Sequence, residues 1–551
     1  MSDNKAMAEL LFENITATPE DYEKKYPARD LKEGAIVTRF APSPTGFLHF
    51  GGLFASFIGR IAANGSGGVF YLRIEDTDKK REIENGAELI VSGLKAFGIN
   101  IDEGVISDTE EKGEYGPYTQ SKRTDIYQAF VKRLVEQGVA YPCFMTEEEI
   151  AEVRQQQEVG KKLPGIYGEY AKYRDITVEE AKSLIDAGKE YVVRLKSPGK
   201  EGGRIKFKDM IKGDIEMDEN ILDVVLLKKD GTPTYHFAHA VDDHLMRTTH
   251  VIRGDEWISS VPIHLQLFRI CGFKPVKYVH ISPIMKEENG GKRKLSKRKD
   301  PEAAVSYYEE QGYPKGAIWE YLLTLANSNY EEWRKCNKTA DTREFPFSFG
   351  KMSKAGALFD LAKLNDISKN YISLLNAEEV FDMTSKWAKE YDEKLYDLLA
   401  EDEEYALAIF AIERGNAKPR KDIAKWTDVR DYIAYFYSEL WDKKRDFADN
   451  VSKEDIAKIL EKYKEIYDSD GAAEDWFPKV RELAVELGFA AAPKEYKKNP
   501  DDYKGHVGDV SGVIRAAVTG RRNTPDLYEI MQVLGGTETL KRIDEAIEIV
   551  K

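Results

Sequence analysis

Two segments of this sequence, about 240 residues apart, carry side chains that could bind phosphate. In the first, a β-branched run ends near Arg39, a loop with two prolines follows, and His49 directly precedes a Gly51-Gly52 pair. Ligands of open α/β sheets bind beyond the carboxyl ends of the strands, and helix N-termini attract phosphate. His49 could therefore donate a hydrogen bond to a nucleotide phosphate. An isolated His-x-Gly-Gly is, however, more often a capped helix beside a structural histidine.

The second segment is a basic cluster at residues 292–299 (KRKLSKRK), which follows a glycine turn and is expected to lie on a mobile loop. Lys294 and Lys297 flank Leu-Ser, and two such cations could neutralise charge on a transferred phosphoryl group and its pyrophosphate leaving group. Taken alone, the cluster is more simply explained as a solvated basic loop or a non-specific nucleic-acid contact. The sequence has no Walker-type motif, so phosphate binding would not follow the P-loop plan.

The segments around these residues are predicted to alternate between strand and helix. Strands are expected at residues 35–40 and 69–74, with a helix at 51–63 between them. Strand, helix and strand joined by short turns form a βαβ unit and predict a parallel sheet. Further strands are expected at 221–228 and 250–252, and a further helix at 260–271.

The rest of the chain has a different texture. The first 33 residues are expected to form an appended polar helix, and residues 116–240 interrupt the strand–helix alternation as an inserted domain. After about residue 345, long charged runs with helical periodicity predict an almost entirely α-helical second half. The clearest of these runs are residues 377–390, 393–413 and 453–466.

Length and composition limit the class of protein. A chain of 551 residues is too long for one core and predicts three to five domains. A net charge of −15 disfavours a protein that coats nucleic acid indiscriminately, although local basic clefts remain compatible with it. Three widely spaced cysteines (Cys143, Cys271 and Cys336) indicate a reducing compartment. With no apolar signal core and no run long enough to span a bilayer, we expect a cytoplasmic protein without a membrane contact.

Five blocks of the sequence resemble, in the same order, those of glutamyl-tRNA synthetases, a family of class I aminoacyl-tRNA synthetases. The blocks are residues 39–52 (RFAPSPTGFLHFGG), 72–78 (LRIEDTD), 241–246 (VDDHLM), 251–257 (VIRGDEW) and 294–298 (KLSKR). Weaker similarity continues through residues 514–520 and 524–531, so that the resemblance covers roughly residues 36–551. The glutaminyl branch has a different first block, with Pro-Pro-Glu-Pro-Asn where this chain has residues 41–45. Mutually consistent signals of this kind outweigh the simpler explanation of each motif.

The resemblance implies a pocket for glutamate. A buried substrate carboxylate needs a cationic partner with fork geometry, and Arg39 and Arg253 lie near predicted strand ends. A surface salt bridge of Arg253 with Asp255 or Glu256 is the simpler alternative. By resemblance, Arg39 and Arg253 bracket the carboxylates and Glu75 holds the α-ammonium group, while Ala41, Ser43, Tyr235 and His239 line the pocket.

The resemblance also implies an ATP site and a two-step reaction. The glutamate carboxylate would attack the α-phosphorus of ATP, and the terminal ribose hydroxyl of the tRNA would then attack the acyl carbon. His49, Lys294 and Lys297, with Mg²⁺, would supply positioning and charge neutralisation rather than a covalent nucleophile. The implied ATP-binding residues are His49, Gly51, Gly52, Glu256, Trp257, Met285, Lys294, Ser296 and Lys297.

The partners follow from the same resemblance. We expect L-glutamate and tRNA(Glu) as substrates, with tRNA bound before glutamate is activated, and we expect a monomer that does not bind DNA. The helical half would read the anticodon by stacking and polar contacts. The candidate contacts are Arg420, Lys421, Trp426 and Arg521, each of which could instead be an ordinary structural or solvated residue.

Four positions depart from the family's pattern. Gly52 stands where the first signature often ends in histidine, so His49 would carry the phosphate contact alone, and His239 stands where many relatives have asparagine. Of the bacterial zinc pattern in the inserted domain only Cys143 and Tyr170 remain, because Met145 and Lys172 occupy the other thiolate positions. Tetrahedral zinc needs about four ligands, so we predict no structural zinc and no other protein-held metal.

The expected fold is α/β, with a Rossmann-like parallel-sheet catalytic domain, an inserted α+β domain and all-α anticodon-binding domains. The expected boundaries are an N-terminal extension at 1–33, the catalytic domain at 34–115 and 241–345, the inserted acceptor-stem-binding domain at 116–240, and the helical domains at 346–551.

Three alternatives remain. A non-discriminating enzyme would also charge tRNA(Gln) with glutamate. A glutamyl-queuosine synthetase would lack the anticodon domains, and some 200 helical residues argue against it. A catalytically silent tRNA-binding paralogue would not need the intact set of Arg39, His49, Glu75, Lys294 and Lys297.

Overall fold

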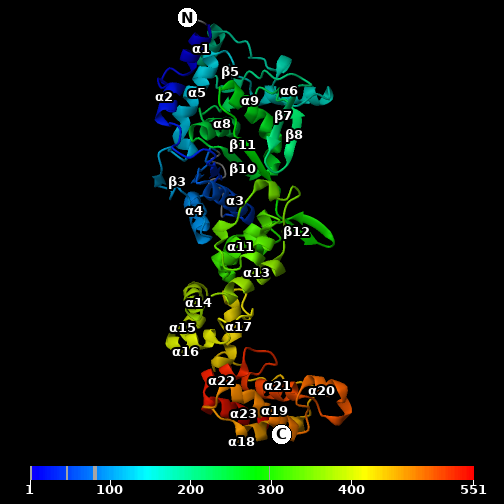
Figure 1. The fold of residues 1–551 in the computed structure, drawn as a ribbon. Coiled ribbons are helices and arrows are strands. Elements are labelled where there is room, and N and C mark those ends of the chain that lie inside the picture. The colour runs from blue at the N-terminus through cyan, green and yellow to red at the C-terminus, as the bar shows by residue number, and fades with distance from the viewer. Residues whose placement is uncertain (1–2, 45–47, 78–82, 297) are drawn as a thin grey trace. The chain divides into compact units, whose positions relative to one another are not determined.

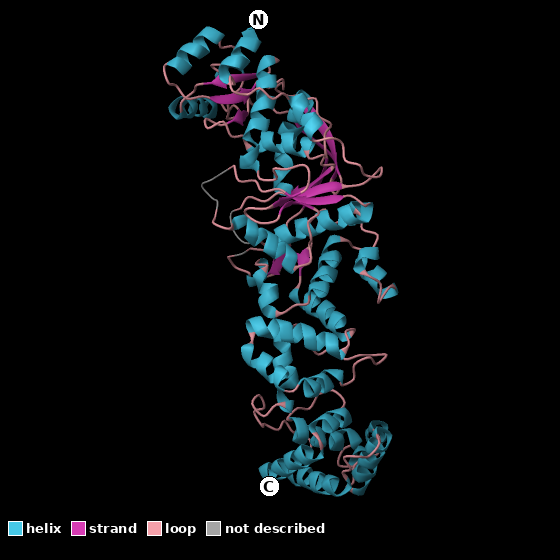
Figure 2. Cartoon of the chain, turned by 90° about the vertical axis from the view of Figure 1, so that its left-hand side faces the viewer, coloured by secondary structure: helices cyan, strands magenta, loops and turns pink. Residues whose placement is uncertain are grey.

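The computed structural model describes residues 3–44, 48–77, 83–296 and 298–551. The chain divides into two compact units, which we call unit 1 (residues 1–308 and 319–360) and unit 2 (residues 309–318 and 361–551). Unit 1 contains all the named strands of the described residues, whereas the named elements of unit 2 are helices (Figures 1 and 2). The predicted succession of an α/β part and a helical part is therefore confirmed. The finer division into five parts stays a prediction.

The predicted βαβ unit is present at the start of unit 1. Strand β1 (Val37–Phe40) pairs in parallel with β2 (Val69–Leu72), and helix α3 (Phe50–Ser66) connects them. Gly67 ends α3 with a φ of 66°, a left-handed conformation that glycine adopts without steric cost. The sheet continues through β3 (Glu103–Val105) and β4 (Glu111–Lys112), and α4 (Gly86–Ala96) lies between β2 and β3 in the sequence.

A second sheet of unit 1 combines strands from distant parts of the sequence. Its order is β10 (His250–Gly254), β11 (Lys277–Ile281), β7 (Arg204–Asp209) and β8 (Gly213–Asp218). Helices α8 (Tyr235–Leu245) and α9 (Val261–Ile270) flank β10 in the sequence. The β7–β8 hairpin comes from the inserted segment, and its end joins the sheet through the pairing of Asp209 with Tyr278. We did not predict this hairpin or its addition to the sheet.

The remainder of the inserted segment is α+β, as expected. Its antiparallel sheet has the order β5 (Ala140–Cys143), β6 (Val192–Leu195), β9 (Val225–Leu227). Its helices are α5 (Thr124–Glu136), α6 (Glu147–Val159) and α7 (Val178–Asp186). The strand expected at 221–228 is shorter than predicted and is limited to β9.

The first part of the basic cluster is a strand and not the loop that we expected. Residues 291–294 form strand β13 (Gly291–Lys294), which pairs antiparallel with β12 (Met285–Glu288) in the register Met285↔Lys294. The short β14 (Leu358–Phe359) completes this sheet. Strands β12 and β13 are rich in charged residues and mostly exposed, so they lack the apolar alternation that predicts a strand. The chain then passes through α10 (Ser306–Gln311), α11 (Lys315–Ala326) and α12 (Tyr330–Cys336).

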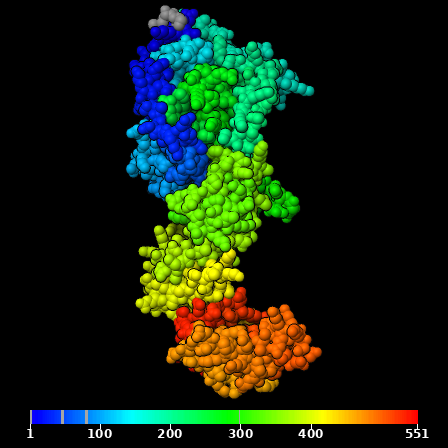
Figure 3. All heavy atoms as spheres, viewed as in Figure 1, coloured from blue at the N-terminus to red at the C-terminus, as the bar shows by residue number. Residues whose placement is uncertain are grey.

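The N-terminal segment also differs from the expected single polar helix. It forms α1 (Asp3–Leu11) and α2 (Pro19–Lys25), and α1 packs on α5 and α7. Met7, Phe12 and Tyr26 are buried there, and the Tyr26 hydroxyl donates a hydrogen bond to the carbonyl of Gly116 at 2.8 Å. In Figure 3 the blue atoms of this segment lie along one edge of unit 1. The segment is therefore part of the folded unit, and we call residues 3–31 the N-terminal strap.

Unit 2 consists of helices around a core that includes Trp387, Trp426 and Tyr435. The predicted run at 453–466 forms a helix with the same bounds, whereas the run at 393–413 is two helices separated at Asp402, whose carboxylate caps the second. Its helices are α13 (Leu361–Ser373), α14 (Ala377–Tyr391), α15 (Glu393–Glu401), α16 (Glu403–Ala411), α17 (Val429–Ile433), α18 (Lys453–Ile466), α19 (Ala473–Glu486), α20 (Pro493–Lys498), α21 (Val507–Thr519), α22 (Leu527–Leu534) and α23 (Gly536–Val550). No helix among the described residues is long and apolar enough to cross a membrane.

Candidate active site

A cavity of about 720 Å³ opens in unit 1 where β1 and β10 end and α3 begins. This is the edge at which parallel sheets bind ligands. Twelve of the predicted site residues line it: Arg39, Ala41, Ser43, His49, Gly51, Gly52, Glu75, Tyr235, Arg253, Glu256, Trp257 and Lys294. His239, Met285 and Ser296 are not among its lining residues, and Lys297 lies outside the described residues.

The start of α3 explains the glycines of the first motif. His49 is the N-cap of α3, and its Nδ1 accepts a hydrogen bond from the backbone N–H of Gly52 at 2.9 Å. The ring proton of the neutral imidazole therefore lies on Nε2. A Cβ at Gly51 would lie 3.2 Å from the His49 ring, and a Cβ at Gly52 would lie 3.0 Å from the Leu48 side chain. Glycine at both positions thus lets the imidazole fold over a helix terminus whose N–H groups attract anions.

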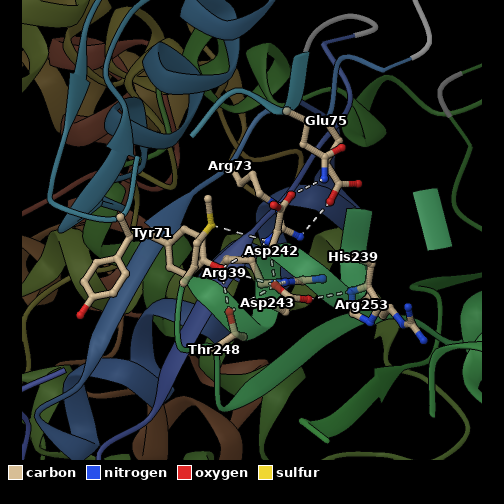
Figure 4. A network of polar contacts seen from close by, with 12 residues as sticks. Arg39, Tyr71, Arg73, Glu75, His239, Asp242, Asp243, Thr248 and Arg253 are labelled. Atoms are coloured by element: carbon tan, nitrogen blue, oxygen red, sulfur yellow. Dashed lines mark hydrogen bonds and ion pairs between the residues drawn. The ribbon is translucent and has the colours of Figure 1, made fainter. Parts of the chain in front are cut away.

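Arg39 is held by a carboxylate that the sequence analysis did not single out. Its Nε lies 3.1 Å from Oδ1 of Asp243, which is fully buried (Figure 4). The same carboxylate lies 2.8 Å from Nη1 of Arg73 and 2.6 Å from Nδ1 of His239. Although burial opposes ionisation, the guanidinium groups of Arg39 and Arg73 hold the pKa of Asp243 well below its usual range.

Glu75 and Asp242 complete this buried network. Nη2 of Arg73 donates a hydrogen bond to Glu75 at 3.0 Å, and burial raises the pKa of the Glu75 carboxyl. Asp242 accepts hydrogen bonds from Arg123 at 2.7 Å and from Tyr127 at 2.7 Å. Glu75 lines the cavity and can accept a hydrogen bond from an ammonium group, whereas Asp242 lies behind it.

Arg253 is the second cavity-lining guanidinium, and its partners are of a different kind. It donates hydrogen bonds to the His280 ring at 3.1 Å and to the Tyr235 hydroxyl at 3.2 Å. Asp255 instead pairs with Lys212 at 2.9 Å, and the described residues show no ion pair of Arg253 with Asp255 or Glu256. The simpler alternative of a surface salt bridge is therefore wrong.

His239 lies deeper than we expected. It is fully buried, and its two ring nitrogens contact Asp243 and the hydroxyl of Tyr278. Burial lowers the pKa of His239 to about 4, so its ring is neutral at pH 7. As His239 does not line the cavity, the prediction that it completes the pocket wall is not supported; it lies behind Tyr235, at 6.1 Å between ring centroids.

The predicted nucleotide residues fall into two groups. Trp257 and Glu256 line the cavity, and the Trp257 ring lies 4.5 Å from that of Tyr235. Met285 begins β12, four residues after β11 ends at Ile281, and it is not among the residues that line the cavity. The backbone N–H of Ser296 donates a hydrogen bond to Asp300 at 2.9 Å, which fixes the turn after Lys294.

The predicted anticodon residues lie in unit 2. Arg420 pairs with Asp422 at 2.7 Å, Arg521 pairs with Asp431 at 2.8 Å, and Lys421 is exposed. Trp426 is buried in the core of the unit and cannot stack on a base without unfolding. Trp426 is therefore not an RNA contact.

The positions of the zinc pattern do not assemble a metal site. Cys143 is buried, and the ammonium group of Lys172 pairs with Glu149 at 2.7 Å. Among the residues that the structure describes, no three His, Cys, Asp or Glu side chains are grouped as metal ligands would be. The absence of structural zinc stays a prediction.

The comparisons with known proteins cover nearly the whole chain. The model of the catalytic domain of class I tRNA synthetases (E and Q) matches residues 35–366, and that of an anticodon binding domain matches residues 379–547. Glutamate–tRNA ligase of Clostridium perfringens (strain 13 / Type A) is 53% identical over 541 residues, which are 98% of this chain and 99% of that protein. Its counterpart from Acetivibrio thermocellus is 48% identical over 546 residues, 99% and 100% of the two chains.

A solved structure agrees with these matches. The crystal structure of a glutamate tRNA ligase from Elizabethkingia meningosepticum in complex with its amino acid superposes with a TM-score of 0.72 at 28% identity, covering 94% of this chain and 100% of that one. The resemblance seen in the five sequence blocks is thereby confirmed. The chain belongs to the glutamate–tRNA ligases, a family of class I aminoacyl-tRNA synthetases.

Proposed function

We propose that this protein joins L-glutamate to the 3′ end of tRNA(Glu) with ATP, releasing AMP and pyrophosphate. The observation that carries the proposal is the cavity, which is lined by two guanidinium groups and a carboxylate and also by a helix N-terminus. The first set suits an amino acid with a second carboxylate, and the second suits a polyphosphate. The full-length relatives called glutamate–tRNA ligase support the same reaction.

In the glutamate pocket, Arg253 and Arg39 would attract the carboxylates and Glu75 would accept hydrogen bonds from the ammonium group. The Tyr235 hydroxyl, 3.2 Å from Arg253, would orient the substrate beside that guanidinium. Ala41 and Ser43 line the same cavity with small side chains and leave room for the substrate. Each of these roles can be tested by substituting the residue.

In the first step, the α-carboxylate of glutamate attacks the α-phosphorus of ATP, and the bond to pyrophosphate breaks. His49 can donate a hydrogen bond from Nε2 to a phosphate oxygen, and the N-terminus of α3 supports it with backbone N–H groups. Lys294 lies at the cavity wall, where its ammonium can neutralise charge on the leaving pyrophosphate. Lys297 belongs to the same basic cluster and is proposed for the same task.

In the second step, the terminal ribose hydroxyl of the tRNA attacks the acyl carbon, and AMP leaves. The reaction needs no covalent enzyme intermediate, so the rate acceleration would come from holding the hydroxyl and the acyl carbon in the right geometry. Trp257 and Glu256, which line the same cavity, would hold the adenosine. Mg²⁺ would arrive with the phosphates, since this ion keeps water and phosphate oxygens as most of its ligands.

The helical unit would read the anticodon, with Arg420, Lys421 and Arg521 as proposed contacts. The match of residues 379–547 to an anticodon binding domain supports this role for the unit as a whole. Arg420 and Arg521 would have to exchange their carboxylate partners for RNA. Because ATP and tRNA are cytoplasmic substrates, we propose that the protein acts in the cytoplasm, as a monomer.

The test is aminoacylation with radiolabelled glutamate on purified tRNA(Glu) and tRNA(Gln) side by side. We expect charging of tRNA(Glu), and we expect Lys294→Ala to lower its rate by about 100-fold or more, the scale of losing one preorganised charge contact. Charging of tRNA(Gln) at a similar rate would identify a non-discriminating enzyme. If the protein bound tRNA but charged none, the proposal would be wrong and the protein would be a catalytically silent tRNA-binding paralogue.

A further inference from the structure

Arg253 differs from the other buried guanidinium groups around the cavity in having neutral partners. Arg39, Arg73 and Arg123 each lie within 3.1 Å of an Asp243 or Asp242 carboxylate. The hydrogen-bond partners of Arg253, in contrast, are two imidazole rings, one phenol and one backbone carbonyl. They are His280 at 3.1 Å, His264 at 3.3 Å, the Tyr235 hydroxyl at 3.2 Å and the carbonyl of Trp257 at 3.3 Å. Within the described part of the chain, no carboxylate forms an ion pair with Arg253.

The His280 ring is oriented by Asp209 from the inserted segment. His280 Nδ1 lies 2.8 Å from Oδ2 of Asp209, and both side chains are buried. The other carboxylate oxygen of Asp209 accepts hydrogen bonds from the backbone N–H groups of Ile211 and Lys212 at 2.9 and 2.8 Å, so the carboxylate cannot rotate freely. An ionised carboxylate only accepts, and the ring proton must therefore lie on Nδ1. This tautomer presents the Nε2 lone pair to Arg253.

His264 forms a second arm of the same kind. Its Nδ1 accepts from Nη2 of Arg253, which places the ring proton on Nε2, 3.0 Å from Nδ1 of the partly exposed His236. His264 itself is fully buried. Both rings thus hold the guanidinium through neutral nitrogen acceptors, and the Asp209 carboxylate contacts His280 at the ring nitrogen that does not face Arg253.

We propose that His280, fixed by Asp209, and His264 are positioning residues that hold Arg253 by neutral acceptors so that its charge stays uncompensated for the substrate carboxylate. The inference rests on the proposed function, which assigns Arg253 to glutamate. A carboxylate in the place of the His264 ring would hold the guanidinium equally firmly. It would also neutralise the charge that attracts the substrate, and glutamate would then have to displace a buried ion pair.

The surroundings keep these rings neutral. Burial and the nearby charge of Arg253 lower the pKa of His264 well below its usual range. Burial also lowers the pKa of His280, although Asp209 opposes the shift. Four further ionisable side chains lie next to the His280 and His264 rings: Asp255, Tyr278, Tyr235 and His236. The Asp243 carboxylate contacts His239, which lies beside His264.

A matched pair of substitutions separates positioning from charge. His264→Gln and His264→Glu both offer an oxygen acceptor in a side chain of similar length, and only the second adds a negative charge. We expect His264→Gln to keep the KM for glutamate within about threefold of the wild type. We expect His264→Glu to raise it by about 10- to 100-fold, the scale of a hydrogen bond to a charged group, with the KM for ATP unchanged. At position 280 only His280→Gln is used, with the same expected result, because a carboxylate there would meet Asp209 and take up a proton.

His250→Leu is the matched control, because His250 is also a buried histidine of this sheet and contacts Thr249 rather than Arg253. We expect it to change thermal stability without changing the KM for glutamate. Equal effects of the Gln and Glu variants on that KM, or equal changes in the KM for ATP, would overturn the inference. A wild-type protein that does not charge glutamate would instead refute the proposed function, and the two failures are therefore distinguishable.

Discussion

Asp243 is the residue on which most of the buried charge of unit 1 converges. It lies within 3.1 Å of Arg39, Arg73 and His239, and its side chain is fully buried. Because His239 is neutral at pH 7, Asp243 neutralises two guanidinium groups with one charge. Asp242 and Glu75 supply the remaining negative charge next to Arg73. The network fixes Arg39 at the cavity wall even when no substrate is bound.

Asp243→Asn tests this role, because the substitution keeps the shape of the side chain and removes its charge. Arg39 and Arg73 would then lose the anion that they share, and the free energy of unfolding should fall by roughly 3–5 kcal/mol. Urea unfolding of unit 1 measures the change. Asp186→Asn is the control, since its exposed i,i+4 pair with Lys182 should contribute less than about 0.5 kcal/mol. A similar small effect at Asp243 would mean that water already solvates the network.

The cavity lining could be predicted from the sequence, but the residues that hold it could not. Arg39, His49, Glu75, Arg253 and Lys294 stand in sequence blocks whose spacing resembles a known family, and the structure brings them to one cavity. Asp243 was inside a quoted block, yet nothing in its spacing indicates a pair with a residue 204 positions away. Asp209 is the last residue of β7, in which charged and apolar residues alternate, and nothing in the sequence indicates its contact with His280.

At the scale of elements, the β12–β13 hairpin positions the basic cluster. Arg293 lies on β13 and points to two carboxylates, Asp300 at 2.6 Å and Glu288 at 2.8 Å. Asp300 is buried and also accepts hydrogen bonds from the Ser296 backbone N–H and from Lys286. The hydrogen bond from Arg293 holds the pKa of Asp300 well below its usual range. One carboxylate therefore closes the turn that follows Lys294.

We expect Asp300→Ala to release this turn while leaving the rest of unit 1 folded. Hydrogen exchange at the amides of residues 291–299 should speed up, and tRNA-stimulated pyrophosphate exchange should fall by about 10-fold or more as Lys294 loses its position. Glu288→Ala is the matched control, because it removes only the exposed partner of Arg293. Unchanged hydrogen exchange in Asp300→Ala would show that the hairpin holds its shape without the carboxylate.

Elements with a strong apolar period were predictable, and charged elements were not. The run at 453–466 has apolar residues on one face and forms α18 with the predicted bounds. The hairpin at 285–294 has no such face, and its strands are held by cross-strand pairing and by Asp300. The break at Asp402 carries neither glycine nor proline, so only the cap that its side chain makes with Tyr405 reveals it.

At the scale of the whole molecule, the N-terminal strap joins regions of unit 1 that are far apart in the sequence. Arg29 pairs with Glu103 through two hydrogen bonds of 2.7 and 2.9 Å, and Glu23 accepts from Arg247 at 2.7 Å. Lys132 of α5 donates to the carbonyls of Phe12 and Ile15. The strap therefore contacts both the catalytic sheet region and the inserted segment.

Deletion of residues 1–31 should destabilise unit 1 alone. The loss of three buried side chains, each worth roughly 1.5–3 kcal/mol, should lower the unfolding transition of unit 1 by roughly 5–10 °C. Calorimetry of the two-unit chain provides an internal reference, because the transition of unit 2 should not move. Glu20→Ala, which removes only an exposed pair with Arg133, should shift neither transition by more than about 1 °C. A deletion that shifts both transitions equally would show that the two units unfold together.

The strap also sets a delay during synthesis of the chain. Glu23 leaves the ribosome early, but Arg247, its ion-pair partner, is 224 residues further along. At roughly 5–20 residues per second, the nascent chain needs roughly 10–45 s before the two can meet. During that interval the residues that bury Met7, Phe12 and Tyr26 in the folded protein are not all in place, and these apolar side chains remain exposed on the nascent chain. The strap is thus translated well before Arg247, and chaperones that bind exposed apolar segments have that interval in which to act.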